Sequence, residues 1–222
     1  MRRRNLIKEE VEQRGIGCLM HFTQAHNLPG IVKHGLLSRA RLRECDDVNA
    51  YASSQCRLDE QDGAISVSIS AINLEMFWAK DRACGQPYWV VLLLDPSILW
   101  THRCVFHRRN AATKDMRDHR GRRDGPWGFS EMFSDKHRPP MFKGESYRAE
   151  TGIPSFLPTY PDAEVQVFDP ILPDLIQGAW VDQEDLAKAV QEQLDQLPGP
   201  ERTTYLRPFL KFTNGHEGWL VP

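Results

Sequence analysis

Apolar residues recur along the chain in short segments whose spacing predicts strands. Residues 64–70 alternate an apolar side chain with serine, which is the period of a half-buried strand. Residues 88–95 are almost unbroken in their apolar character, which predicts a strand buried on both faces. The stretches 18–23 and 163–168 predict two further strands, and residues 104–106 a short one.

Helical spacing of apolar residues predicts the remaining regular structure. The expected helices span residues 5–14, 27–37, 73–83 and 182–197. Asn27 can act as the N-cap of the second helix, with Pro29 in its first turn and Gly35 as its stop. Asp182 is expected to cap the last of the four helices.

Two stretches lack a regular pattern and predict loops. Residues 40–63 are polar, and residues 107–162 are long, polar and rich in Gly, Pro and aromatic residues. Loops of this length in a compact domain usually serve function. Residues 203–221 predict mixed short elements. Because no repeat or linker interrupts the pattern, we expect a single α+β domain over residues 1–222.

The composition is that of an ordinary folded protein. The chain has 222 residues, 41% apolar and 26% charged, with a formal net charge of −2, so any nucleic-acid surface must be a local patch. Its five cysteines are scattered and odd in number, which argues against a disulfide framework and a zinc site, and we assign no metal. With no signal peptide and no run long enough to span a bilayer, we expect a cytoplasmic protein without membrane contact.

Three features are candidates for chemistry. His21 lies on the first predicted strand, Glu164 begins a later one, and residues 103–123 carry eight Arg or Lys against two Asp. Taken singly, each also has a structural interpretation, as a core histidine, a solvated edge carboxylate and a solvated basic loop. The basic segment is nevertheless a local cationic stripe that can neutralise phosphates. The candidate DNA-binding residues are Arg108, Arg109, Arg120, Arg122 and Arg123.

The order and spacing of these features resemble the DarT family, the DNA ADP-ribosyltransferase toxins of bacterial toxin–antitoxin systems. The most diagnostic parts are a His-x-Thr…Asn-Leu-Pro…Gly-Leu-Leu pattern in residues 21–37 and Asp-Ala-Glu-Val-x-Val in residues 162–167. The similar segments also include residues 86–99 and 105–112. The resemblance covers about residues 16–172, whereas residues 180–222 match no known pattern.

The resemblance implies a split, mostly antiparallel sheet around an NAD⁺ crevice, with flanking helices. It also implies transfer of ADP-ribose from NAD⁺ to a base of single-stranded DNA, and a macrodomain antitoxin (DarG-like) as partner. Glu164 is then the catalytic carboxylate, because cleavage of the nicotinamide–ribose bond passes through an oxocarbenium-like state that a carboxylate stabilises. His21 would bind the ribose hydroxyls, and the Phe22–Thr23 backbone the nicotinamide amide.

Further cofactor-binding candidates follow from the same resemblance. Gly30 can let the cofactor approach the backbone, Asn27 and Ser38 (with Arg39) can meet the phosphates, and Met76 can pack beside the nicotinamide or the base. For Met76 a core-facing position is the alternative. The serines of residues 66–70 are similar to the Ser-Thr-Ser motif of arginine-modifying toxins, or they form a solvated strand face.

One departure from the family bears on the acceptor base. The thymine-modifying branch carries an arginine just after the second strand, but residues 70–78 contain none. The Asn73-x-x-Met76-Phe77 pattern is similar to the branch linked to guanine, so guanine is favoured over thymine. Two alternatives stay open: an ADP-ribosyltransferase acting on RNA or protein, and a nucleic-acid-binding module without turnover.

Overall fold

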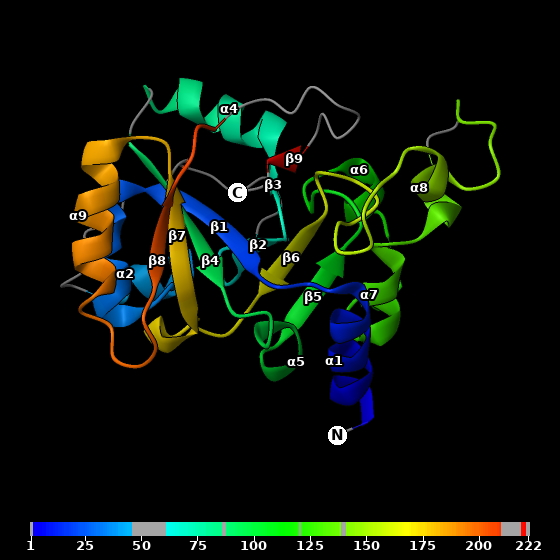
Figure 1. Ribbon diagram of the computed structural model, residues 1–222. Coiled ribbons are helices and arrows are strands. Elements are labelled where there is room, and N and C mark those ends of the chain that lie inside the picture. The colour runs from blue at the N-terminus through cyan, green and yellow to red at the C-terminus, as the bar shows by residue number, and fades with distance from the viewer. Residues whose placement is uncertain are drawn as a thin grey trace.

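The computed structural model is built around a seven-stranded mixed sheet (Figure 1). It describes residues 2–45, 61–85, 88–119, 121–138, 141–209 and 219–220. The strands of the sheet are β1 (Leu19–Gln24), β2 (Ile65–Ile69), β4 (Trp89–Leu94), β5 (Cys104–His107), β6 (Glu164–Val167), β7 (Ile176–Val181) and β8 (Thr203–Leu206). Their order is β5-β6-β2-β1-β4-β7-β8, and every neighbouring pair is antiparallel except β7–β8. Two short strands, β3 (Ile72–Asn73) and β9 (Trp219–Leu220), pair separately. The expected α+β class with a mostly antiparallel sheet is confirmed.

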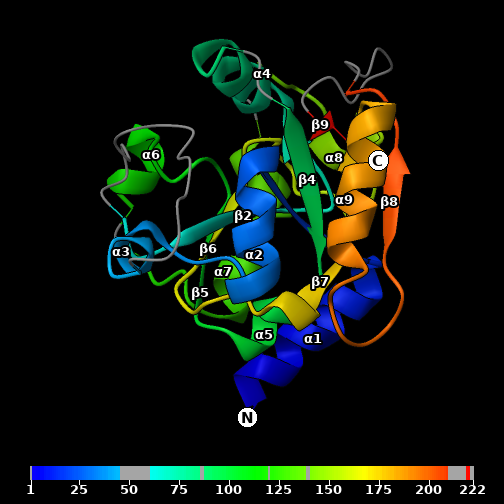
Figure 2. The same ribbon diagram turned by 90° about the vertical axis from the view of Figure 1, so that its left-hand side faces the viewer.

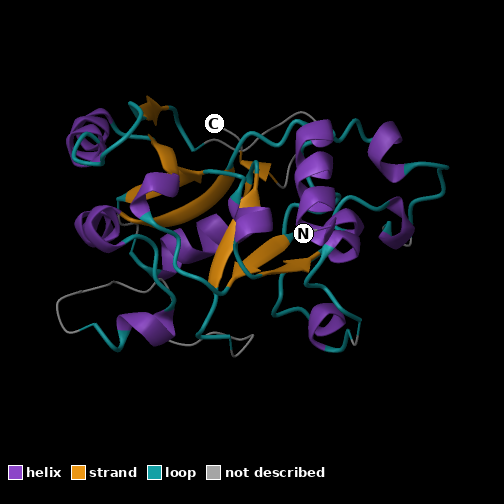
Figure 3. Ribbon diagram, turned by 90° about the horizontal axis from the view of Figure 1, so that it is seen from below, coloured by secondary structure: helices purple, strands orange, loops and turns teal. Residues whose placement is uncertain are grey.

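Helices surround this sheet, as the view from below shows (Figure 3). The α-helices are α1 (Arg2–Arg14), α2 (Leu28–His34), α3 (Arg39–Leu42), α4 (Leu74–Ala83), α5 (Ile98–Thr101), α6 (Lys114–Arg117), α7 (Pro126–Glu131), α8 (Tyr147–Glu150) and α9 (Glu184–Leu194). Three 3₁₀ turns are η1 (Ala25–Asn27), η2 (Asp135–His137) and η3 (Pro173–Leu175). Helices α2 and α9 lie together at one end of the molecule (Figure 2), and α1 and α7 lie at the other. Within the described residues, no helix combines the length and apolar character needed to cross a bilayer.

The sheet is buried on both faces, and β4 shows why its sequence is apolar throughout. Val90, Leu92 and Leu94 point into a large core covered by α1, α2, α5, α7 and α9. Trp89, Val91 and Leu93 alternate with these residues and point from the opposite face into a second core, which α4 closes. Because successive side chains of a strand point to opposite faces, a strand covered on both sides needs apolar residues at every position.

Strand β7 is a strand that the sequence pattern did not predict. Its burial is nearly complete, but exposed Gln177 and the glycine at 178 interrupt the apolar pattern. Gly178 is needed because a Cβ there would lie 2.6 Å from the carbonyl oxygen of Thr203 on β8. A close backbone contact with a strand 25 residues away is a tertiary property, so local periodicity does not report it.

The predicted helix ends were partly right. Asn27 occupies the N-cap position of α2, and Gly35 ends that helix with φ of 80°. However, the Asn27 side chain makes no cap bond. The prediction for Asp182 was wrong: α9 begins after Gln183, and the acidic residues of its first turn face the positive end of the helix dipole instead. Residues 40–63 were expected to be loop, but α3 extends into them; residues 46–60 lie outside the described part.

Candidate active site

The sheet divides into two parts where β1 and β2 separate. Their antiparallel pairing includes only Leu19 with Ile69 and Met20 with Ser68, whereas β1 pairs with β4 along its whole length. Cys18 accepts from the Ser70 N–H on the β2 side, so the even-numbered residues of β1 direct their backbone groups toward β2. The N–H and C=O of Phe22 therefore face the edge that β2 no longer pairs.

His21 and Glu164 meet at this division through one serine. The His21 Nδ1 atom lies 2.9 Å from the backbone oxygen of Ser66 on β2, where the next bonds of the β1–β2 ladder would otherwise form. The Ser66 hydroxyl donates to the Glu164 Oε1 atom at 2.5 Å. Both His21 and Glu164 are half-buried, so they remain accessible from solvent. The structure thus brings together the two residues on which the sequence argument depends, through contacts spanning 45 and 98 residues of chain.

The second carboxylate oxygen of Glu164 is held from the other side. The backbone N–H of Ala111 donates to Oε2 at 2.9 Å. Asp162 fixes the turn that carries Ala111, because its carboxylate accepts from Arg109 Nε at 2.7 Å and from the Asn110 N–H at 3.3 Å. Two donors thus set the orientation of the Glu164 carboxylate.

A buried polar network supports the strands that carry this carboxylate. His107 lies opposite Glu164 in the β5–β6 register. Arg123 Nη1 lies 2.8 Å from His107 Nδ1, and because a guanidinium only donates, Nδ1 is the acceptor. His107 Nε2 then donates to Gln166 Oε1 at 3.1 Å, which gives the neutral ring. Burial, with a smaller effect of the Arg108 charge, lowers the pKa of Arg123 from its usual value, but arginine stays charged at neutral pH.

The other predicted cofactor-binding residues fall into two groups. Thr23 and Asn27 lie together at the end of β1, where Asn27 Nδ2 donates to the Thr23 hydroxyl at 3.0 Å. The Phe22 ring packs into the second core, with ring centroids 5.5 Å from Phe77 and 5.6 Å from Trp89, so its backbone is the part left for a ligand.

Gly30, Ser38 and Met76 lie on other elements. Gly30 is the third residue of α2, and Ser38 is buried, its hydroxyl accepting from the Arg41 N–H as the cap of α3. Met76 is half-buried in the first turn of α4 and belongs to none of the apolar clusters among the described residues. The three thus lie on α2, at the cap of α3 and on α4, whereas His21 lies on β1 and Glu164 on β6.

The arginines of the cationic segment are engaged with neighbouring groups. Arg108 pairs with Asp115 at 2.6 Å, Arg109 with Asp162, and Arg122 with Asp124 at 2.8 Å. Arg123 contacts His107 and donates to the Met116 carbonyl. Arg120 lies outside the described residues. Pairing reduces the local positive field that the sequence alone implies, although exposed charge pairs of this kind are weak and can exchange for phosphate contacts.

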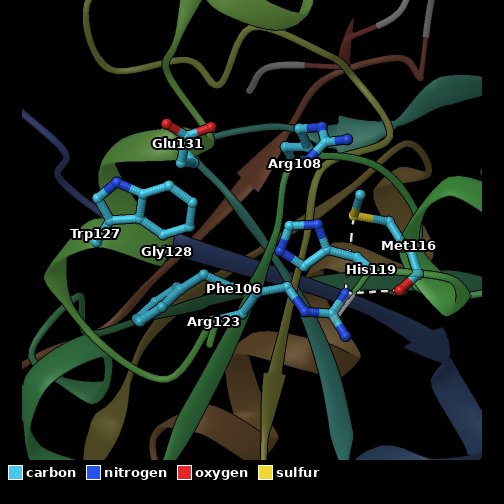
Figure 4. A pocket seen from close by; sticks show the side chains of 8 residues that line it. All are labelled: Phe106, Arg108, Met116, His119, Arg123, Trp127, Gly128 and Glu131. Atoms are coloured by element: carbon cyan, nitrogen blue, oxygen red, sulfur yellow. Dashed lines mark hydrogen bonds between the residues drawn. The ribbon is translucent and has the colours of Figure 1, made fainter. Parts of the chain in front are cut away.

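Arg108 and Arg123 line a shallow surface recess beside α7 (Figure 4). The recess also contains the exposed indole of Trp127, the Glu131 side chain and the imidazole of His119. The close-up shows Trp127 and Glu131 on one side of the recess and Met116, His119 and Arg123 on the other. The recess therefore presents both signs of charge.

Sequence reasoning missed two side chains and one backbone group of the site. Ser66 had a signal in the serine alternation of β2, and in the structure its hydroxyl donates to Glu164. Asp162 had a weaker signal, as part of the Asp-Ala-Glu motif. The Ala111 N–H had none, because any residue type can supply a backbone donor.

Comparison with solved structures shows which fold this chain shares. Thermus sp. 2.9 DarT in complex with carba-NAD⁺ matches with a TM-score of 0.57 at 13% identity, covering 86% of this chain and 96% of that chain. The same protein in complex with ADP-ribosylated ssDNA matches with a TM-score of 0.57 at 15% identity, covering 87% of this chain and 95% of that chain. Thermosipho africanus DarTG in complex with ADP-ribose matches with 0.54 at 12% identity, covering 88% of this chain but only 52% of that chain. At these identities the likeness shows the fold, which is that of an ADP-ribosyltransferase.

A family model identifies the chain more closely. The model described as "ssDNA thymidine ADP-ribosyltransferase, DarT" matches residues 20–212, so this protein belongs to the DarT family. It is an NAD⁺-dependent ADP-ribosyltransferase of single-stranded DNA. The match extends well past residue 172, where the sequence resemblance ended, and includes β7 and β8. A search of curated protein sequences found no match.

Proposed function

We propose that Glu164 is the catalytic carboxylate of a reaction that transfers ADP-ribose from NAD⁺ to guanine in single-stranded DNA. The observation that carries the proposal is the Glu164 carboxylate itself, oriented by the Ser66 hydroxyl and the Ala111 N–H and linked through Ser66 to His21. The carboxylate is held by donors from two separate elements, β2 and the turn after β5, beside the edge at which β1 and β2 separate.

The chemistry follows from this arrangement. The bond between nicotinamide and the ribose C1′ breaks, and nicotinamide leaves as a neutral molecule with the bonding electron pair. The sugar carries the developing positive charge, which the Glu164 carboxylate stabilises. A base nitrogen then bonds to C1′ and loses a proton, for which Glu164 is the nearby acceptor.

We assign the cofactor-binding role to residues at the division of the sheet. His21 would bind the ribose hydroxyls, and the Phe22 backbone, directed at the unpaired edge, would bind the nicotinamide amide. Thr23 and Asn27, bonded to each other, lie next along the chain. Gly30 is proposed to allow close approach of the cofactor, Ser38 to meet its phosphates, and Met76 to pack beside the nicotinamide or the base. The Thermus sp. 2.9 DarT complexes with carba-NAD⁺ and NAD⁺ support NAD⁺ as the ligand of this fold.

The DNA strand is proposed to cross the segment between β5 and α7. Arg109 is linked to the carboxylate through Asp162 and the turn at Ala111, and Arg108, Arg122 and Arg123 are the other described candidates. Arg120 is a further candidate from the sequence. Single-stranded DNA suits the reaction because a base inside a duplex must first be extruded. The Thermus sp. 2.9 DarT complex with ADP-ribosylated ssDNA supports this substrate class.

Guanine is proposed as the acceptor because residues 70–78 contain no arginine. In the structure this stretch follows β2 and forms β3 and the first part of α4, where Asn73 caps the helix by accepting from the Met76 N–H. The family description names thymidine, so the acceptor base has to be measured.

We propose that this protein acts as a toxin and that its partner is a DarG-like macrodomain antitoxin. The support is the match to Thermosipho africanus DarTG, of which this chain spans about half the length.

The test combines base identity with removal of the carboxylate. The protein is incubated with NAD⁺ and mixed single-stranded oligonucleotides, and the nucleosides are analysed by mass spectrometry. We expect an ADP-ribose adduct on deoxyguanosine. Glu164→Gln should lower kcat by about 10²–10³-fold with NAD⁺ affinity changed only a few-fold, because the carboxylate acts mainly in the transition state.

Glu184→Gln, an exposed glutamate on α9, is the matched control and should behave as wild type. Adducts on thymidine alone would overturn the guanine assignment, and adducts only on RNA or protein would overturn the DNA assignment. An active Glu164→Gln protein would remove Glu164 from catalysis. If the wild-type protein releases no nicotinamide, the remaining interpretation is a nucleic-acid-binding module without turnover.

A further inference from the structure

A line of cationic and aromatic side chains extends from the Glu164 site. The Arg109 guanidinium carbon lies 4.4 Å from the centroid of the Tyr160 ring. Tyr160 lies 6.5 Å from Tyr147, with 27° between the ring planes, and Tyr147 meets Phe142 edge to face at 5.2 Å. The Arg138 guanidinium lies 5.9 Å from Phe142. We call these five residues the aromatic ladder.

The inner end of this ladder is fixed at the catalytic carboxylate. Arg109 donates to Asp162, which also holds the turn whose Ala111 N–H donates to Glu164. Any movement of Arg109 is therefore coupled to the turn that orients Glu164. A strand whose acceptor base lies at Glu164 would meet Arg109 and Tyr160 first.

The rings of the ladder are not ordinary core residues. Tyr160, Tyr147 and Phe142 are half-buried, whereas Phe129 and Phe133 of the same long segment are buried. Among the described residues, Tyr160 and Phe142 belong to none of the three apolar clusters, whereas the half-buried Tyr147 packs against the third one, formed by Ala71, Ile153 and Leu157. Burial raises the pKa of Tyr160, partly offset by the charge of Arg109, so this phenol stays neutral at physiological pH and does not repel phosphates.

We propose that the aromatic ladder is the track on which bases adjacent to the acceptor base stack, with phosphates against Arg109 and Arg138. The ligand class is single-stranded nucleic acid, which binds through base stacking on aromatic rings beside cations. This inference rests on the proposed function, since it assumes that the acceptor base lies at Glu164.

The recess beside α7 is the less suitable track. Its Trp127 is exposed, but Arg108 is only 12% exposed and paired with Asp115, and Arg123 is committed to His107 and Met116. Glu131 adds a negative charge there (Figure 4). In the ladder Arg109 is likewise paired, with Asp162, and Arg138 donates to the Gly144 and Glu145 carbonyls, but the Arg109 side chain is 41% exposed and Arg138 is exposed.

The test compares Tyr147→Ala with Trp127→Ala by fluorescence anisotropy of labelled single-stranded oligonucleotides of increasing length. Stacking of a base is worth about 1–3 kcal/mol, so Tyr147→Ala should weaken binding of a long strand about 5- to 150-fold. Tyr147→Phe, which keeps the ring, should bind within about threefold of wild type, as should Trp127→Ala. Wild type should gain affinity as the strand is extended on one side of the acceptor base, and Tyr147→Ala should gain less.

The outcomes separate the two proposals. If wild type modifies DNA but Tyr147→Ala binds long strands as wild type does, the ladder is wrong and the proposed function stands. Loss of affinity in Trp127→Ala instead would move the track to the recess. Wild type that modifies no DNA contradicts the proposed function itself. If Tyr147→Ala does not fold, Phe142→Ala, at the outer end of the ladder, is measured in the same assay. The ladder is then refuted if Phe142→Ala gains as much affinity as wild type when the strand is lengthened.

Discussion

Asp162→Ala tests whether the site depends on the turn that precedes α6. The Asp162 carboxylate accepts from Arg109 Nε and from the Asn110 N–H, and the following N–H, that of Ala111, donates to Glu164 at 2.9 Å. Removing the carboxylate leaves the turn without its anchor, so the Ala111 donor should lose its fixed position. Asp162 touches no proposed reacting atom, so it acts as a positioning residue.

The magnitude follows from these contacts. The Arg109 side chain is 41% exposed, so its ion pair with Asp162 is worth about 0–1 kcal/mol after solvent screening. The larger effect is the lost donor on Glu164, since a hydrogen bond to a charged group is worth about 1.5–3 kcal/mol. If that bond is made in the transition state, kcat should fall about 10- to 150-fold. The KM for NAD⁺ should change only a few-fold, because the residues proposed to hold the nicotinamide and its ribose lie on β1.

The assay measures nicotinamide release and DNA adducts at saturating NAD⁺ and DNA. Asp162→Asn keeps an acceptor for the Asn110 N–H and should recover much of kcat. Asp115→Ala removes a comparable pair with Arg108 that is not linked to Glu164, and kcat should stay within about twofold.

The reasoning is refuted if folded Asp162→Ala, judged by its melting temperature, retains kcat within about threefold of wild type. It is equally refuted if Asp115→Ala lowers kcat as much as Asp162→Ala does.

Two further predictions concern DNA binding and stability. Arg108→Ala combined with Arg109→Ala should weaken binding of single-stranded DNA and reduce its salt slope by about 0.7 per lost phosphate contact, measured by anisotropy titrations at several salt concentrations; an unchanged slope removes these residues from the interface. Gly35→Ala should lower the melting temperature by about 4 °C or more in differential scanning fluorimetry. The new Cβ would lie 2.3 Å from the Ile171 carbonyl oxygen at φ of 80°. Gly63→Ala, with no atom within 4 Å, is the control, and equal melting temperatures would contradict the argument.

Local patterns predicted the strands well because periodicity reports burial. The serine alternation of β2 and the apolar run of β4 correspond to a half-buried strand and a strand covered on both faces. The same reasoning failed at β7, where a glycine required by contact with β8 interrupts the pattern. It also failed at α9, because the choice of cap depends on how the chain leaves the preceding strand.

Charge is another property that sequence reported only in part. Counting residues 103–123 indicated a cationic stripe, but Arg108 and Arg109 each have a carboxylate partner in the structure. The partner of Arg109, Asp162, is 53 residues away in sequence. Ion pairing between distant segments decides how much of the formal charge a polyanion would meet.

The sequence by itself determined the strands that carry His21 and Glu164, the long segment between them and the resemblance to the DarT family. These depend on local side-chain order, which a chain displays without folding. Only the tertiary structure decided that Ser66 joins the two residues, that β1 and β2 separate after Met20, and that the Ala111 N–H reaches the carboxylate. Those contacts join segments 45 to 98 residues apart, and no local pattern encodes which distant hydrogen-bonding groups will meet once the sheet has formed.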